Sequence, residues 1–101
     1  MVINEGIKAV IEGSAFLTLV TVGPDGVPHP IITGKGEVMG DTVIFGIYKM
    51  EKTQKNLAAN NSAWVVAATK DGGPKGYRLS GTAEAKGKQL IFTPVKADPL
   101  I

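Results

Sequence analysis

Six runs of β-forming residues joined by short turns are the feature that most limits how this 101-residue chain can fold. The runs cover residues 15–22, 27–38, 42–48, 62–69, 76–85 and 89–95. Their short links require antiparallel pairing between successive strands. Six such strands in so small a domain must close, or nearly close, to bury one face and hide their edges. We therefore predict a mainly β chain that forms a six-stranded antiparallel barrel.

Two short helices complete the expected fold. Asn4 suits an N-cap, and Ile7, Val10 and Ile11 follow at helical spacing before Gly13 ends the segment. A second helix is expected at about residues 51–60, between the third and fourth strands. Because no repeat or linker divides the chain, residues 1–101 are interpreted as a single domain. The core of such a domain is small, so burial against a partner chain would stabilise it.

Charge and composition argue against several classes of function. The net charge is +2, the lysines are dispersed, and Arg78 is the only arginine, whereas nucleic acid favours clustered arginines and stacking aromatics. The chain has no cysteine, so disulfides and thiolate metal sites are excluded and redox chemistry needs a borrowed cofactor. No signal peptide is recognisable, and no apolar run approaches the ~18 residues of a membrane span. We expect a cytoplasmic protein without a nucleic-acid or membrane partner.

A Lys-Thr pair, Lys52-Thr53, lies where the third strand gives way to the second helix. A helix start offers unpaired N–H groups and a partial positive charge, to which this pair adds an ammonium and a hydroxyl. The preceding strand at residues 42–48 is apolar nearly throughout. An aromatic cofactor held by a phosphate tail is therefore the first hypothesis, and a solvated helix start without a ligand is the plain alternative.

Three segments carry a resemblance to a known family. They are Lys52-Thr53-Gln54-Lys55-Asn56-Leu57, Gly76-Tyr77-Arg78-Leu79-Ser80-Gly81-Thr82-Ala83-Glu84 and Asp25-Gly26-Val27-Pro28-His29. In this order they resemble the Lys-Thr-x-x-Asn-Leu stretch, the fifth strand and the first hairpin of the pyridoxamine 5′-phosphate oxidase-like family, especially its small FMN-binding proteins. The resemblance implies a split β-barrel with noncovalent FMN at a homodimer interface.

The resemblance also implies which residues bind the cofactor. Lys52 and Thr53 would hold the FMN phosphate. The backbone around Tyr48, Lys49 and Met50 would line the ribityl chain and the ring. Thr33 and its neighbours Ile32 and Gly34 fall where the family's second strand meets the flavin. Tyr77 and Arg78 on the fifth strand are further candidates, each with a structural alternative.

Two departures from the family pattern bear on activity. Relatives usually insert a helix before the last strand, whereas this chain turns directly through residues 86–88. The full-length oxidase has a C-terminal substrate signature that contains arginine, and nothing after Gln89 is similar to it. Oxidation of pyridoxamine phosphate itself is therefore not expected.

Several single residues have two interpretations. His29, the only histidine, is interpreted as a surface residue rather than a functional one. Trp64 is expected in the core or a dimer interface rather than stacked on flavin. For Arg78 we expect either a structural ion pair or a contact with the flavin or a partner chain. For Tyr77 we expect either a position at the edge of the flavin or packing in an interface. The carboxylates form no recognisable pair, so we predict no catalytic residue and no metal site.

Three classes of function remain open. The first is a noncovalent FMN carrier that passes electrons between protein partners, and it is favoured because no acid–base set is visible. The second is an FMN-dependent oxidoreductase, similar to a flavin reductase, that reduces a small molecule using a nicotinamide or deazaflavin donor. The third is a cofactor-free small barrel that binds protein or nucleic acid.

Overall fold

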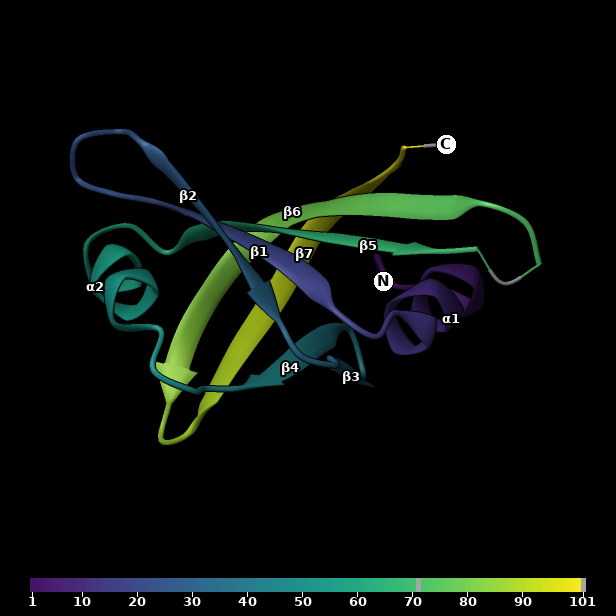
Figure 1. The fold of residues 1–101 in the computed structure, drawn as a ribbon, viewed down its shortest axis with the longest axis horizontal. Helices are drawn as coiled ribbons and strands as arrows, with labels where there is room; N and C mark the ends of the chain where they lie inside the picture. Colours follow the sequence, from purple (N-terminus) through teal and green to yellow (C-terminus); the bar gives the residue numbers. More distant parts are fainter. Residues whose placement is uncertain (71, 101) are drawn as a thin grey trace.

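A computed structural model describes residues 1–70 and 72–100. It shows a mainly β fold with two helices that lie at opposite ends of the molecule (Figure 1). Helix α1 (Glu5–Gly13) precedes strands β1 (Leu17–Val22), β2 (Pro28–Thr33), β3 (Glu37–Met39) and β4 (Thr42–Gly46). Helix α2 (Glu51–Ala59) then leads into β5 (Ser62–Thr69), β6 (Lys75–Lys86) and β7 (Gln89–Pro99). The predicted fold class and both predicted helices are confirmed. Residue 71, within the predicted loop 70–75, and residue 101 lie outside the described residues.

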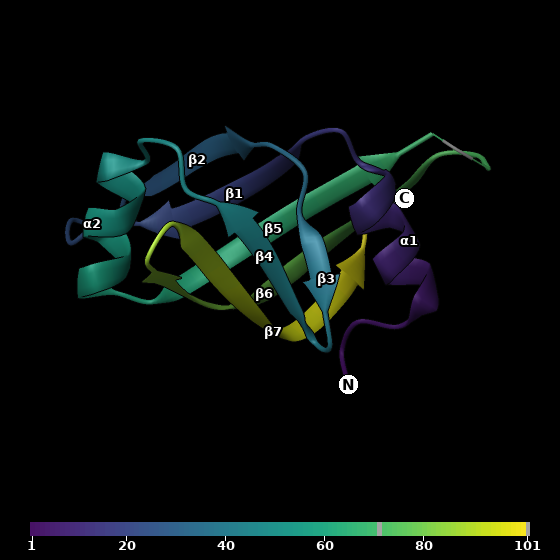
Figure 2. The ribbon, with the colours of Figure 1, turned by 90° about the horizontal axis from the view of Figure 1, so that it is seen from below.

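The strands form one antiparallel sheet in the order β2-β1-β5-β6-β7-β4-β3. Strands β2 and β3 are consecutive in the sequence, yet they lie at opposite edges of this sheet. An extended chain covers about 3.5 Å per residue, so the short link between them spans at most about 14 Å. The sheet must therefore curl until its two edges approach each other, as Figures 1 and 2 show. The result is a barrel that stays split between β2 and β3.

The predicted strand at residues 27–38 is the one element that needs correction, because it is two strands separated by residues 34–36. The barrel therefore has seven strands instead of six. The reason is the packing at Gly36, where an added Cβ would lie 2.7 Å from Leu17 Cδ1 and 2.9 Å from Val43 Cγ1. Bare backbone at this position lets the chain cross from one edge to the other against the core.

The core lies inside the barrel and under helix α1. Alternate residues of β1, Leu17, Leu19 and Thr21, are buried, whereas the intervening residues are partly exposed. Helix α1 adds Ile7, Val10 and Ile11 to the core, and its start is capped as predicted by Asn4, whose Oδ1 accepts a hydrogen bond from Ile7 N at 2.9 Å.

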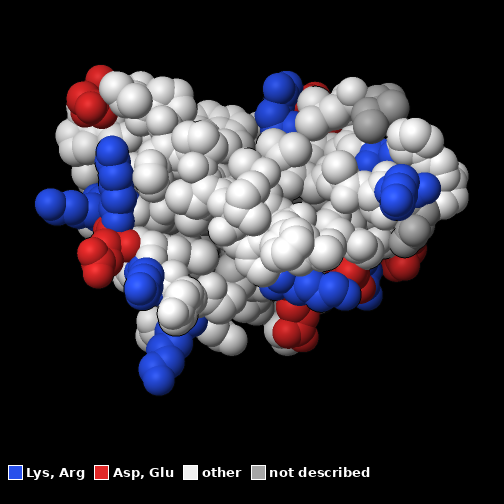
Figure 3. Space-filling model, viewed as in Figure 1, with Lys and Arg blue, Asp and Glu red and all other residues white. Residues whose placement is uncertain are grey.

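The outward face of β2, β1 and β5 is largely apolar. The register places Val20 between Pro30 on β2 and Trp64 on β5, and Thr18 between Ile32 and Val66. Trp64 is half-buried on this face and not in the barrel core, while Ile32 is 67% exposed. In Figure 3 the charged side chains lie around the rim of the view, and its middle is uncharged.

No helix in residues 1–70 or 72–100 is long and apolar enough to cross a membrane.

Candidate functional site

The turn that leads from β4 into α2 has an unusual backbone. Lys49 and Met50 have φ values of 64° and 48°, so two successive non-glycine residues adopt the left-handed conformation. Each costs on the order of 1–3 kcal/mol, and such strain is concentrated at functional sites. Gln54 braces the turn, since its Nε2 donates to the Lys49 carbonyl at 3.0 Å. The turn is therefore held in a conformation that ordinary loops avoid.

Helix α2 begins without a side-chain cap from the described residues. Its N-cap is Met50, which has no polar side-chain group to accept from the first turn, and the first helical bond runs from Gln54 N to the Met50 carbonyl at 2.9 Å. The N–H groups of Glu51, Lys52 and Thr53 consequently have no partner within the helix. A helix start of this kind attracts an anion.

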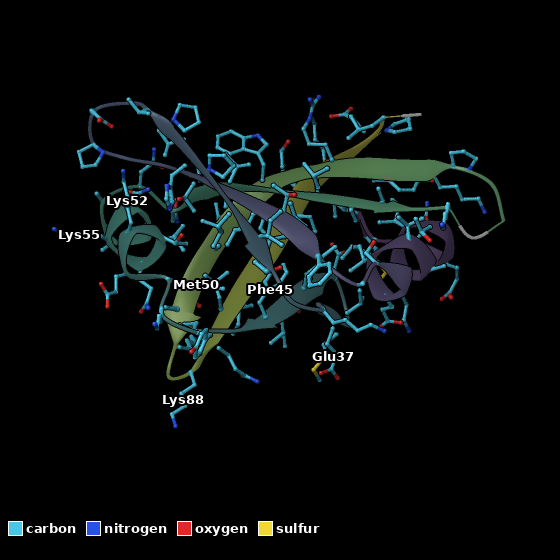
Figure 4. All side chains as sticks on the ribbon, viewed as in Figure 1. Glu37, Phe45, Met50, Lys52, Lys55 and Lys88 are labelled. Carbon is cyan, nitrogen blue, oxygen red and sulfur yellow. The ribbon has the colours of Figure 1, made fainter. Side chains whose placement is uncertain are left out.

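A cleft of about 520 Å³ opens beside this helix start. Pro24 from the β1–β2 turn lines one side, and Glu51, Lys52, Lys55 and Asn56 of α2 line the other. Figure 4 shows Lys52 and Lys55 projecting from the outer side of α2, and Figure 3 shows that basic side chains gather at this end of the molecule. Two lysines of α2 therefore line one cleft beside the helix start, with Glu51 as the carboxylate among its lining residues.

Thr53 is buried and is not among the residues that line the cleft. It is 1% exposed, and its Oγ1 is buried without a hydrogen-bond partner among the described residues. A buried hydroxyl left unpaired costs about 1–3 kcal/mol, and native structures nearly always satisfy such groups with protein, water or ligand. Within the Lys-Thr pair, Lys52 is therefore exposed, whereas the hydroxyl of Thr53, one residue further into the helix, is buried.

The remaining residues expected from the β4–α2 segment lie in the turn itself. Tyr48 is 80% exposed, and Lys49 Nζ lies 5.7 Å from the centroid of its ring, within cation–π range. Met50 is half-buried. These residues adjoin the helix start, so the structure brings them together with Lys52.

The second-strand residues do not share one face. Ile32 points outward from β2, whereas Thr33 is 4% exposed. The Thr33 hydroxyl lies 3.2 Å from the Leu17 carbonyl and 3.0 Å from the Gly34 carbonyl, so an internal acceptor already engages it. Gly34 is exposed at the start of the link to β3.

Tyr77 and Arg78 also point to opposite faces of their strand. Tyr77 packs against the core, while Arg78 is exposed and forms an ion pair with Asp98 at 3.8 Å. This ion pair is the structural alternative that the sequence left open for Arg78. Neither residue lines the cleft beside α2. His29, on β2 opposite Thr21, is half-buried.

Pro24, Glu51 and Asn56, which help to complete the cleft, were not predicted as site residues. Lys55 is expected beside Lys52, because residues three apart on a helix share a face. Pro24 has no such signal, since its place depends on how the β1–β2 turn packs against α2.

The curled seven-stranded sheet and the two helices define a class of small split-barrel protein. Within that class the chain belongs to the pyridoxamine 5′-phosphate oxidase family, whose model matches residues 3–97. No curated protein is similar enough in sequence to count as a match.

Several solved structures share the fold. HupZ from Group A Streptococcus is 18% identical with a TM-score of 0.82, over 97% of this chain and 94% of that one. An FMN-binding protein from Syntrophomonas wolfei is 20% identical with a TM-score of 0.78, over 93% and 83% of the two chains. An F420 reductase is 16% identical with a TM-score of 0.78, over 95% and 98%. At these identities the similarity establishes the fold.

Proposed function

We propose that this protein binds FMN without a covalent link and carries electrons between protein partners. The observation that carries the proposal is the helix start at α2, where Lys52 and Lys55 line one cleft, no side chain caps the first turn and the preceding turn is strained. A phosphate monoester carries nearly two negative charges at neutral pH. Each charge-assisted hydrogen bond to it contributes about 1.5–3 kcal/mol.

In this proposal different residues of the chain bind different parts of the cofactor. Lys52 and the first-turn N–H groups hold the phosphate, and Lys55 adds a second positive charge to the cleft. The buried Thr53 hydroxyl, which has no partner among the described residues, becomes satisfied when ligand or ordered water reaches the first turn. The turn at Tyr48, Lys49 and Met50 lines the ribityl chain and the ring. FMN supplies one- and two-electron chemistry, while the protein sets its position and access.

The proposal includes a homodimer formed through the outward face of β2, β1 and β5. This face presents Pro30, Val20 and Trp64 in one row, with the 67% exposed Ile32 in the next. A contiguous apolar sheet face on a small domain is a site for association. A two-fold dimer places the same patch against itself, which adds apolar burial to a small core.

The carrier role is preferred to a dedicated enzyme because the cleft provides no acid–base set. Glu51 is the carboxylate among its lining residues, and no second carboxylate or histidine joins it there. The lysines around α2 favour an acidic redox protein as the partner. The alternative is an FMN-dependent oxidoreductase that acts on a small molecule, and the similarity in fold to an F420 reductase favours testing it.

Purification followed by flavin titration tests the central proposal. We expect a yellow protein that binds one FMN per chain and releases it into the supernatant on acid precipitation. A colourless protein that fails to quench the fluorescence of added FMN would contradict flavin binding and favour a cofactor-free barrel.

Stopped-flow kinetics separates carrier from enzyme. We expect slow or absent turnover with NADH or NADPH and a small acceptor, and rapid exchange with an acidic redox protein. That exchange should slow as salt rises, because screening shortens the reach of surface charges to about 8 Å near physiological ionic strength. Efficient multiple turnover with a nicotinamide donor would instead assign the protein as an oxidoreductase.

A further inference from the structure

A buried side-chain hydrogen bond joins helix α2 to the barrel wall. Asn56 Nδ2 donates to Thr21 Oγ1 at 3.1 Å, and the two residues are 3% and 0% exposed. Thr21 lies on β1, where that strand pairs with both β2 and β5. This bond therefore joins the middle of α2 to a strand that is paired on both sides.

The same asparagine approaches the β1–β2 turn closely. A Cβ added at Gly23 would lie 3.3 Å from Asn56 Oδ1, so the turn and the helix meet with little space between them. Asn56 also lines the cleft together with Pro24 of that turn. One side chain thus contacts the strand, the turn and the cleft, and it lies one helical turn beyond Lys52.

The start of α2 needs such an anchor because its own cap is weak. Met50 provides no polar side-chain group, and it follows Lys49 in a second strained left-handed conformation. Propensity and capping therefore do little to fix where the first turn of α2 lies. Its position depends on contacts made further along the helix.

From this geometry we infer that Asn56 and Thr21 are positioning residues for phosphate binding. Their hydrogen bond sets the distance between α2 and the β1–β2 turn, and so aims the first-turn N–H groups and Lys52 into one cleft. The inference deepens the proposed function and rests on it. It assigns the selectivity for a phosphorylated flavin over the free riboflavin to the position of α2, which this bond sets from Thr21, a residue outside the cleft lining.

Thr21 provides the sharpest test, because a residue that is 0% exposed and absent from the cleft lining cannot contact the ligand. Thr21→Val keeps the shape of the side chain and removes the acceptor. Any change in flavin selectivity must therefore pass through Asn56. Thr21→Ser restores the hydroxyl and is the conservative variant that should rescue the effect.

The experiment measures FMN and riboflavin affinities by fluorescence quenching for wild type, Thr21→Val and Thr21→Ser. We expect Thr21→Val to weaken FMN by about three- to tenfold, the value of one buried hydrogen bond, and riboflavin by less than about twofold. Ser14→Ala is the matched control, since it removes a buried hydroxyl that bonds Val10 and Ala68 carbonyls beside α1, at the other end of the molecule. It should leave the affinity ratio unchanged.

Hydrogen exchange of the flavin-free protein provides a readout independent of the cofactor. Thr21→Val should speed exchange of the α2 amides relative to wild type and to Ser14→Ala. Unchanged α2 exchange, or equal weakening of FMN and riboflavin, would overturn the positioning role alone and would not contradict the proposed phosphate site. A wild type that binds FMN no more tightly than riboflavin would overturn the proposed phosphate site instead.

A second variant covers the case in which Thr21→Val fails to fold. The double variant Thr21→Val/Asn56→Leu replaces both polar partners with apolar groups of similar shape, a change that can leave stability nearly unaltered. A folded double variant that keeps the wild-type FMN to riboflavin ratio would also overturn the inference.

Discussion

Gly36 packs directly against Leu17, so that a Cβ added at Gly36 would lie 2.7 Å from Leu17 Cδ1. This contact marks the place where the chain passes from β2 at one edge of the sheet to β3 at the other. Because Leu17 and Val43 are buried around it, no side chain at position 36 has room without moving the core.

Gly36→Ala should therefore destabilise the protein by about 1–3 kcal/mol, the usual cost of overpacking. Gly34→Ala is the matched control, since nothing lies within 4 Å of its added Cβ and its backbone is not left-handed. Urea denaturation measures both variants. Equal stabilities for the two alanine variants would contradict the role given to Gly36.

Asp41 ties the start of the chain to the β3–β4 turn. Its carboxylate accepts hydrogen bonds from Ile3 N at 2.7 Å and from Val2 N at 3.0 and 3.1 Å. These hydrogen bonds lower the pKa of Asp41 below its usual value, and the bond from Ile3 N has the largest effect. A lowered pKa means that Asp41 contributes stability above about pH 4, and that this contribution is lost as the pH falls through the lower folded-state value.

Asp41→Ala should therefore lower the melting temperature at neutral pH and make its fall on acidification shallower than in wild type. Glu37→Ala, which removes an exposed carboxylate from neighbouring β3, is the control. Thermal unfolding followed between pH 3 and pH 7 gives the comparison. Parallel curves for wild type and Asp41→Ala would show that the hydrogen bonds to Asp41 do not influence stability.

Lys52→Ala should weaken FMN binding by about 1.5–3 kcal/mol and riboflavin binding much less, because it removes a charged partner of the phosphate alone. Lys8→Ala, on α1 at the opposite end of the molecule, removes the same charge far from the cleft. Fluorescence titration with both ligands measures the difference. If FMN and riboflavin lose equal affinity, Lys52 is not at the phosphate.

Thr53→Val tests the buried hydroxyl. The flavin-free variant should be as stable as wild type or more so, because the change removes a buried polar group that has no partner in the described part of the chain. Its FMN affinity should fall, since the hydroxyl that the ligand satisfies in the proposed complex is lost. Melting temperatures with and without FMN measure both effects, and an unchanged affinity would exclude Thr53 from the site.

Ile32→Lys tests the dimer. Ile32 is 67% exposed on the outward face of β2, so a lysine there should leave the barrel folded but place a charge in the interface. Light scattering should give twice the chain mass of 10.6 kDa for wild type and a single chain for the variant. Met39→Lys, at a 54% exposed residue on β3, should remain dimeric. A monomeric wild type with flavin bound would disprove this interface.

Local pattern was enough to predict most of the fold. The alternating burial of Leu17, Leu19 and Thr21 and the cap at Asn4 follow from period and capping chemistry, which act over a few residues. The break at residues 34–36 was missed. It depends on Leu17 and Val43, which only the closed barrel brings to Gly36.

The candidate site was predictable only where it depends on local pattern. A Lys-Thr pair after an apolar strand marks a helix start, and the structure has one there at residue 51. The sequence could not show that Thr53 is buried, that Tyr77 and Arg78 face apart, or that Asn56 bonds Thr21. Each of these depends on the register of strands and on the side of α2 that meets the barrel.

By itself, then, the sequence determined the antiparallel class, the two helices and the position of Lys52 at a helix start, because short turns, caps and periodicity are encoded by neighbouring residues. The tertiary structure alone decided that β2 and β3 lie at opposite edges and that Pro24, Lys55 and Asn56 share a cleft with Lys52. Those relationships join segments far apart in the chain. They arise only when closure of the barrel buries one face of the sheet and carries α2 against the β1–β2 turn.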